Sequence, residues 1–283
     1  NMETLPASLS QLTSLHDYDP DSMPVEQARQ LIQHFVQSLA SVESVPLHLS
    51  LHRTLAQDVV SPMNVPPHDN SAMDGYALSF ADVADGSAKL KVTGNSYAGH
   101  PYAGPVTAGT CIRIMTGALI PEGCDTVVMQ EHVKVDGDSI EIGGKPKAGQ
   151  NVRRAGEDIR QGSTVLARGQ LIRAAEMGLL ASLGLAQINV FRKPTVALFS
   201  TGDELQQPGE ALSAGQIYDS NRYTLMGMLQ ELGVEILDMG HIRDERDSLK
   251  TALSRAAAQA DVIITSGGVS VGEADYVKEL LSE

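Results

Sequence analysis

Apolar positions along the chain change their spacing twice, and each change marks a different kind of structure. Near the N-terminus, Ser22 can cap a helix and Pro24 suits its first turn. Apolar residues then recur at helical spacing on one face: Val25, Ala28, Leu31, Ile32, Phe35 and Leu39. From Leu47 to about Lys147 the pattern changes to short alternating or β-branched runs, broken by Pro, Gly, Asn and Asp. These runs predict a compact β domain, with strands at residues 89–92, 111–115, 126–129 and 139–142.

The last third of the chain alternates between apolar strands, short turns and helices. A polar, glycine-punctuated segment leads into it, followed by a short helix over residues 174–183 that Gly184 ends. Strands are then expected at residues 195–199, 234–239 and 261–264, with helices at 221–232 and 249–258. Alternating strands and helices joined by short turns predict a parallel, doubly wound sheet.

The order of these patterns predicts a multidomain α/β plus β protein. Residues 1–21 are polar and aperiodic, so we expect a tail. Residues 22–46 and 149–178 are expected to form an elongated linking domain of helix and strand. A β domain of residues 47–148 is inserted into it, and residues 179–283 form the α/β domain.

Charge and hydropathy exclude two classes of partner. The formal net charge is −14, whereas nucleic-acid binding needs clustered lysine and arginine. An anionic ligand must therefore be held locally, by backbone N–H groups, hydroxyls, a metal ion or grouped bases such as Arg153 and Arg154. No apolar run reaches the ~20 residues that span a bilayer, and the N-terminus lacks the basic and apolar regions of a signal peptide. We expect no membrane association and a cytoplasmic protein.

The most informative stretch is residues 261–276, in which an apolar strand runs into glycines, hydroxyls and carboxylates. Gly267 and Gly268 lack Cβ atoms, so the backbone can turn sharply and present N–H groups to an anion. Ser266 and Ser270 add hydroxyl donors. Carboxylates beside a phosphate repel it unless they hold a cation such as Mg²⁺. The alternative is an ordinary turn whose acids favour a helix N-terminus.

Three turns are expected at one edge of the predicted sheet, because each follows the carboxyl end of a parallel strand. Ligands of such sheets bind at that edge. The first turn is Ser200–Glu204, the second is Gly240–Asp244 and the third contains Asp275. Convergence of Glu204, Asp244 and Asp275 would build an Mg²⁺ and phosphate site. Separately, each acid could also be a helix cap or a solvated loop residue.

The β domain carries two loops rich in special residues, at 64–77 and 113–125. Asp69, Asn70 and Asp125 are typical of turns, in which such side chains satisfy backbone groups. Asp74 before Gly75 is a stronger candidate for function, although it too could be a turn residue. Loops held by a scaffold carry much of protein function.

Cys111 and Cys124 are the only cysteines of the chain. Two cysteines are too few for a disulfide framework, and they lack the CxxC spacing of a redox or metal motif. We expect both to be small buried thiols.

Several segments together resemble the molybdopterin molybdenumtransferases, the bacterial MoeA proteins related to the gephyrin E domain. They are residues 69–77, 115–118, 156–158, 199–204 and 266–276, in that order along the chain. The resemblance implies that molybdate is inserted into the dithiolene of adenylylated molybdopterin, with AMP released in the presence of Mg²⁺. It also implies that the α/β domain is of the molybdopterin-binding type.

The resemblance assigns roles to individual residues. Catalytic roles fall on Asp74, Thr116 and Asp158, and metal binding on Glu204, Asp244 and Asp275. Cofactor binding falls on Ser200, Thr201, Gly202, Ser266, Gly267, Gly268 and Ser270. It further implies a homodimer whose composite active site joins the α/β domain of one subunit to the β domain of the other, and a molybdopterin adenylyltransferase as pathway partner.

The resemblance also has a limit, because the family continues beyond the last residue with further motifs, strands and a final β domain. We therefore expect a chain truncated at its C-terminus, with an incomplete α/β domain and little activity. Two alternatives remain: a molybdopterin adenylyltransferase, which would lack the β domain with Asp74 and Thr116, and a non-catalytic cofactor carrier or scaffold.

Overall fold

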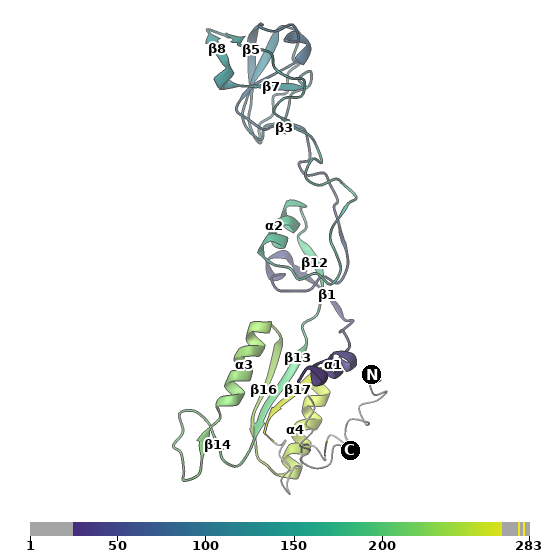
Figure 1. The fold of residues 1–283 in the computed structure, drawn as a ribbon, viewed down its shortest axis with the longest axis vertical. Helices are drawn as coiled ribbons and strands as arrows, with labels where there is room; N and C mark the ends of the chain where they lie inside the picture. Colours follow the sequence, from purple (N-terminus) through teal and green to yellow (C-terminus); the bar gives the residue numbers. More distant parts are fainter. Residues whose placement is uncertain (1–24, 268–276, 278–279, 281–283) are drawn as a thin grey trace. The chain divides into compact units, whose positions relative to one another are not determined.

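The chain divides into two compact units, which are described separately (Figure 1). The computed structural model describes residues 25–267, 277 and 280. Unit 1 consists of residues 1–43 and 190–283, and unit 2 of residues 44–189. Unit 2 is therefore an insertion between the two segments that build unit 1. The predicted domain boundaries at residues 46, 148 and 178 stay predictions.

The centre of unit 1 is a parallel sheet of three strands. The strands are β13 (Thr195–Thr201), β16 (Glu235–Ile242) and β17 (Val262–Ser266), in the order β16-β13-β17. Both neighbours run parallel to β13, with Ser200 opposite Ser266 and Thr201 opposite Ile242. The three predicted strands are thus confirmed, although each begins or ends a few residues away from its expected bounds.

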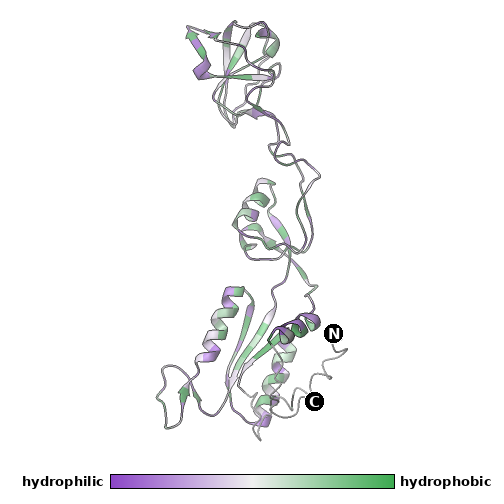
Figure 2. Cartoon of the chain, viewed as in Figure 1, coloured by the Kyte–Doolittle hydropathy of each residue, from purple (hydrophilic) through white to green (hydrophobic). Residues whose placement is uncertain are grey.

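Two helices cover opposite faces of this sheet: α3 (Ser220–Leu232) and α4 (Arg246–Gln259). Side chains of β13 alternate between the two faces. Leu198 packs with Leu229 of α3, whereas Phe199 packs with Leu249 of α4. Hydrophobic residues accordingly run along all three strands (Figure 2). The predicted doubly wound arrangement is confirmed.

At the amino ends of β13 and β17, an ion pair joins the sheet to the segment that precedes it. The Arg192 guanidinium donates Nη1 to Oδ2 of Asp261 at 2.7 Å and Nη2 to Oδ1 at 2.5 Å. Asp261 Oδ2 also accepts the backbone N–H of Thr195 at 2.8 Å. These bonds, led by those from Arg192, lower the pKa of Asp261 from 3.8 to about 2.

We expect Asp261→Asn to destabilise unit 1 in a pH-dependent way. Because the pKa of Asp261 is depressed in the folded state, its contribution is present above pH ~4 and is lost as the pH falls toward 2. Solvent screens the pair, so the cost at pH 7 should be about 1 kcal/mol. Urea unfolding of both proteins at pH 7, 4 and 2.5 measures it. A cost that is the same at pH 7 and at pH 2.5 would contradict this account.

Unit 2 is built around a sheet of six strands in the order β7-β4-β6-β5-β9-β8. The strands are β4 (Gly75–Leu78), β5 (Lys89–Ser96), β6 (Thr110–Ile114), β7 (Thr126–Met129), β8 (Val133–Asp136) and β9 (Ser139–Ile142). All neighbours are antiparallel except β5 and β6. The four strands predicted in this region are confirmed.

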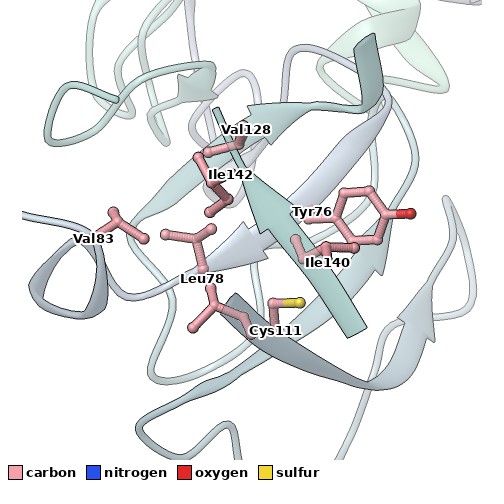
Figure 3. Close-up of a cluster of buried hydrophobic side chains, with 8 residues drawn as sticks. Tyr76, Leu78, Val83, Cys111, Val128, Ile140 and Ile142 are labelled. Atoms are coloured by element: carbon pink, nitrogen blue, oxygen red, sulfur yellow. The ribbon is translucent and has the colours of Figure 1, made fainter. Parts of the chain in front are cut away.

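The core of this sheet encloses one of the two thiols (Figure 3). Cys111 is fully buried in a cluster that includes Tyr76, Leu78 and Ile140. Cys124 packs against the neighbouring cluster around Ile114. Burial raises the pKa of each thiol to about 12. Both cysteines are free. The expected burial holds for Cys111 and is wrong for Cys124, which is only half-buried.

The remaining elements are short. In unit 2 and at its junctions they are β1 (Val42–Pro46), β2 (Val59–Val60), β3 (Asn70–Ser71), β10 (Val152–Arg153), β11 (Thr164–Leu166), β12 (Gln187–Phe191), α2 (Ala174–Ser182) and the 3₁₀ turns η2 (Leu47–Leu49), η3 (Phe80–Asp82) and η4 (Gln130–His132). Unit 1 adds α1 (Val25–Phe35), β14 (Leu205–Gln206) and β15 (Ile217–Tyr218). Helix α2 confirms the predicted helix before Gly184.

Helix α1 differs from its prediction in length and burial. It ends at Phe35, so the predicted helical face is shorter and excludes Leu39. On that face Leu31 is buried, whereas Val25 and Ile32 are exposed. In the part of the chain that the structure describes, no helix combines the length and the apolar character needed to cross a membrane.

Candidate functional site

The carboxyl edge of the unit 1 sheet brings together the turns that the sequence singled out. β13 ends at Thr201, β16 at Ile242 and β17 at Ser266. The chain passes from β13 to β16 on one side and then to β17 on the other side, so the strand order reverses between β13 and β17. Such a switch point is where open α/β sheets bind ligands. The structure therefore places Ser200–Gly202 and Ser266–Gly267 side by side at the expected position.

Gly267 allows the ends of β13 and β17 to approach closely. A Cβ atom on Gly267 would lie 2.2 Å from the carbonyl oxygen of Thr201, and its φ is +101°. Gly202 has a φ of +141°, and a Cβ there would lie 2.7 Å from the Glu204 carboxylate. Only glycine fits both positions without a shift of the backbone or of Glu204. The ends of β13 and β17 thus approach each other more closely than a residue with a Cβ atom at position 267 would allow.

Two hydroxyls and an imidazole at this edge are buried without a partner among the described residues. The atoms are Oγ1 of Thr201, Oγ1 of Thr265 and Nδ1 of His241. Buried polar atoms are nearly always hydrogen-bonded in folded proteins. The two threonine hydroxyls lie on the strands that flank the switch point, whereas His241 lies on β16, on the other side of β13. The two hydroxyls fit a site that takes a polar ligand.

Of the three predicted metal ligands, Glu204 and Asp244 follow β13 and β16 at the same edge. Glu204 is exposed and Asp244 is half-buried. Asp275, Gly268 and Ser270 lie outside the described residues. Within those residues, no group of three or more His, Cys, Asp and Glu side chains could hold a metal ion. Two acids still fit Mg²⁺, which usually takes one or two carboxylates together with phosphate oxygens.

A second candidate site lies in unit 2, where Thr116 binds Asp74. Both the backbone N–H and the hydroxyl of Thr116 donate to Oδ1 of Asp74, at 2.8 and 2.7 Å. These two bonds, with a smaller effect of the Arg113 charge, lower the pKa of Asp74. Asp74 is exposed, so it is an ionised, accessible carboxylate in a fixed orientation. The structure brings these two predicted residues together, and their catalytic roles stay predictions.

The strand after Asp74 is fixed tightly to its neighbours. A Cβ atom on Gly75 would lie 2.1 Å from the carbonyl oxygen of Val128, so only glycine fits. Arg113 of β6 donates Nη1 to the carbonyl of Gly75 at 2.9 Å and lies 5.0 Å from the centre of the Tyr76 ring. The turn that carries Asp74 is therefore held by the sheet.

Asp158, the third predicted catalytic residue, forms an ion pair within unit 2. Arg153 Nη2 donates to Oδ1 and Oδ2 of Asp158, at 2.7 and 2.6 Å. Asp158 thereby raises the pKa of Arg153. Arg154 pairs in the same way with Asp69 at 2.6 Å. Both arginines that could hold an anion are thus already engaged by carboxylates.

The two groups of unit 2 lie on either side of strand β3. One neighbour of β3 is β10, which contains Arg153. On the other side, Gly117, next to Thr116, donates its N–H to the carbonyl of Ser71 at 2.8 Å. The loop 64–77 therefore connects the Asp158 pair with the Asp74 pair.

Comparison with known proteins identifies the family of this fold. Residues 23–184 match the family model described as "MoeA N-terminal region (domain I and II)". The chain belongs to the MoeA family. Residues 197–283 match a second model, described as "Probable molybdopterin binding domain". The MoeA fold is accordingly mixed α/β, with its parallel sheet in the molybdopterin-binding part.

Relatives of this MoeA chain are found among enzymes and solved structures. It is 43% identical over 262 residues to the molybdopterin molybdenumtransferase of Haemophilus influenzae, covering 92% of this chain and 65% of the relative. For the protein of that name from Nostoc sp. the identity is 39% over 276 residues, covering 95% and 63%. A crystal structure of the molybdopterin biosynthesis moeA protein from Pyrococcus horikoshii OT3 has 32% identity and a TM-score of 0.79, covering 86% and 66%. The chain thus spans less than two thirds of the length of the two curated relatives.

One feature of this MoeA chain was missed by the sequence analysis. Ser200 is fully buried, and its hydroxyl donates to Oδ2 of Asp219 at 2.5 Å. Asp219 caps α3 and also accepts Nε of Arg222 at 3.2 Å. The predicted role of Ser200 as a ligand-binding hydroxyl stays a prediction, but its proton is already used inside the protein. The available signal was Asp219, two residues before the predicted start of the helix, since aspartate is a preferred N-cap.

Proposed function

We propose that this chain carries catalytic residues of a molybdopterin molybdenumtransferase. In that reaction molybdate is inserted into the dithiolene of adenylylated molybdopterin, and AMP is released. The observation that carries the proposal is the switch point between β13 and β17, where two glycine turns lie side by side and Glu204 follows one of them. Asp244 follows β16 at the same edge of the sheet. The name of the Haemophilus influenzae relative supports the choice of substrate. The β sheet with Asp74 and Thr116 favours this activity over an adenylyltransferase.

In this proposal Glu204 and Asp244 would hold Mg²⁺. Mg²⁺ bound there would offset the negative charge of the departing adenylate. The residues of the turns bind the phosphate of that adenylate directly. Backbone N–H groups near Gly202 and Gly267 face the anion, and the Thr201 hydroxyl supplies a further donor.

The Asp74 carboxylate supplies a fixed negative charge and a proton acceptor. Both bonds from Thr116 fall on Oδ1, which leaves Oδ2 to face the substrate. Its lowered pKa keeps it ionised at neutral pH. Asp158, held by Arg153, would orient the loop beside it or contact molybdate.

We further propose that the protein acts as a homodimer with a composite site. Asp74 and Thr116 of one subunit would then serve the same reaction as Glu204 and Asp244 of the other. A molybdopterin adenylyltransferase is the expected source of the adenylylated substrate, because the reaction consumes that adenylate. The predicted cytoplasmic location stays a prediction.

Mixing two inactive variants tests both proposals. Glu204→Gln and Asp74→Asn, each alone, should release little AMP from adenylylated molybdopterin with molybdate and Mg²⁺. Co-expressed with two different tags and purified as mixed dimers, they should recover about a quarter to a half of the wild-type rate, since one composite site per dimer is intact. Mixed dimers of Glu204→Gln with Asp244→Asn are the control. Both changes lie in the same half of the site, so no intact composite site forms. If the wild-type chain releases AMP but the mixed dimers recover none of its rate, the composite site is refuted. If the wild-type chain releases no AMP, the proposed activity of this chain is refuted.

A further inference from the structure

A buried arginine lies beneath the carboxyl edge of the unit 1 sheet. The Arg222 side chain is only 4% exposed, and that of its partner Asp219 is 2% exposed. Burying an arginine is costly, and a buried ion pair often adds less stability than apolar packing would. Arg222 nevertheless binds three separate parts of the chain, through Asp219, Asp238 and Gln207.

Towards β13, Arg222 fixes the turn that carries Glu204. Its Nη2 donates to Oε1 of Gln207 at 2.8 Å, three residues after Glu204. Through Asp219 it also reaches the buried hydroxyl of Ser200. The same segment is closed by backbone bonds, in which Ile217 donates to the carbonyl of Glu204 at 2.8 Å. Glu204 is thus held from both ends of its turn.

Towards β16, Arg222 fixes the bulge that leads to Asp244. Its Nη1 donates to both oxygens of Asp238, at 2.7 and 2.8 Å. Asp238 Oδ1 also accepts the N–H of Gly240 at 3.0 Å. The register of β16 against β13 shifts at this point, and Gly240 has a φ of +74°. A bulge re-aims the strand that follows, and that strand ends at Ile242, two residues before Asp244.

We propose that Arg222 is a positioning residue for Glu204 and Asp244, because one guanidinium fixes both the turn that carries the first acid and the bulge that precedes the second. The fork of an arginine matches this task, since all three of its nitrogens donate to different partners. The role of the two acids rests on the proposed function, whereas the bracing of their segments does not.

Arg222→Lys in the whole chain tests the proposal, because lysine keeps the charge and loses the fork. The variant and the wild-type chain are compared at temperatures at which their thermal stability is the same. Amide hydrogen exchange is measured, and so is calorimetric binding of Mg²⁺ in the presence of AMP. We expect exchange to accelerate in residues 202–207 and in residues 240–244. We expect the Mg²⁺ affinity to fall by about 10- to 100-fold, the usual effect of removing a group that orients metal ligands.

Arg192→Lys is the matched control. It weakens an arginine–aspartate pair of the same kind, on the same sheet, at the opposite ends of β13 and β17. It should lower stability and leave both the exchange of residues 202–207 and the Mg²⁺ affinity unchanged. An equal loss of Mg²⁺ affinity in this control would overturn the proposal, because it would assign the effect to general loosening.

Each remaining outcome decides the proposal. A folded Arg222→Lys chain with wild-type exchange and wild-type Mg²⁺ affinity overturns it. If the wild-type chain binds no Mg²⁺ with AMP, the proposed metal site fails, and the exchange of the two segments alone decides the bracing. If Arg222→Lys does not fold, Gln207→Ala replaces it. Faster exchange confined to residues 202–207 then supports the proposal, and unchanged exchange overturns it.

Discussion

Asp74→Asn is expected to lower AMP release from adenylylated molybdopterin at least ~100-fold while the fold stays intact. Asparagine keeps an oxygen that can accept both bonds from Thr116, so the turn should survive. It loses the negative charge and the proton acceptor, and positioned acids and bases typically contribute a factor of about 10²–10⁴. Single-turnover kinetics with molybdate measure the loss, and circular dichroism verifies the fold.

Asp69→Asn is the matched control for this change. Asp69 lies in the same loop, accepts a backbone N–H from Ala155 at 2.8 Å and likewise has a lowered pKa. It pairs with Arg154 and has no predicted catalytic role. Its replacement should therefore cost some stability and little activity. If Asp74→Asn retained activity within about threefold of the wild type, Asp74 would be only a turn residue.

The second large effect is expected for Gly267→Ala, at the contact between β13 and β17. The new Cβ would lie 2.2 Å from the Thr201 carbonyl oxygen, and alanine rarely adopts a φ of +101°. Strain and overpacking together should cost about 2–5 kcal/mol. Urea unfolding of the whole chain measures the loss, and hydrogen exchange should locate it in the two strands.

Gly215→Ala separates the two causes. Gly215 also has a positive φ, of +87°, but a Cβ atom added there would meet nothing within 4 Å. The substitution should cost only about 1–2 kcal/mol, which is the strain of the left-handed conformation alone. Equal losses in both variants would show that the close approach at Gly267 does not matter.

Local sequence pattern predicted the α/β part of the fold well, because its strands are apolar on both faces. β13 was expected over residues 195–199 and extends to Thr201. The extension was not predictable from hydropathy, since its ladder continues with Ser200 and Thr201, whose partners lie on β17 and β16. Helix α1 shows the opposite case: its apolar period is clear, yet burial of the face depends on what packs against it.

The candidate site was predictable in its parts but not in its connections. The meeting of Asp74 with Thr116 joins residues 42 positions apart, a contact that propensity and spacing do not encode. Arg153 and Arg154 were interpreted as anion binders from their charge, whereas the structure pairs them with Asp158 and Asp69. The role of Arg222 was not predicted from the sequence, because this residue lies inside a helix and its partners come from several separate segments.

The buried thiol of Cys111 and the half-buried thiol of Cys124 give this chain a built-in chemical reporter. Only the thiolate reacts with alkylating reagents, and with a pKa of about 12 it makes up about one part in 10⁵ at neutral pH. Both thiols lie in unit 2, and the sequence places no other cysteine in the chain. Labelling of Cys111, which is fully buried, must therefore wait for unit 2 to open. The labelling rate therefore measures the opening equilibrium of unit 2 alone. Unit 1 has no cysteine that the reagent could modify.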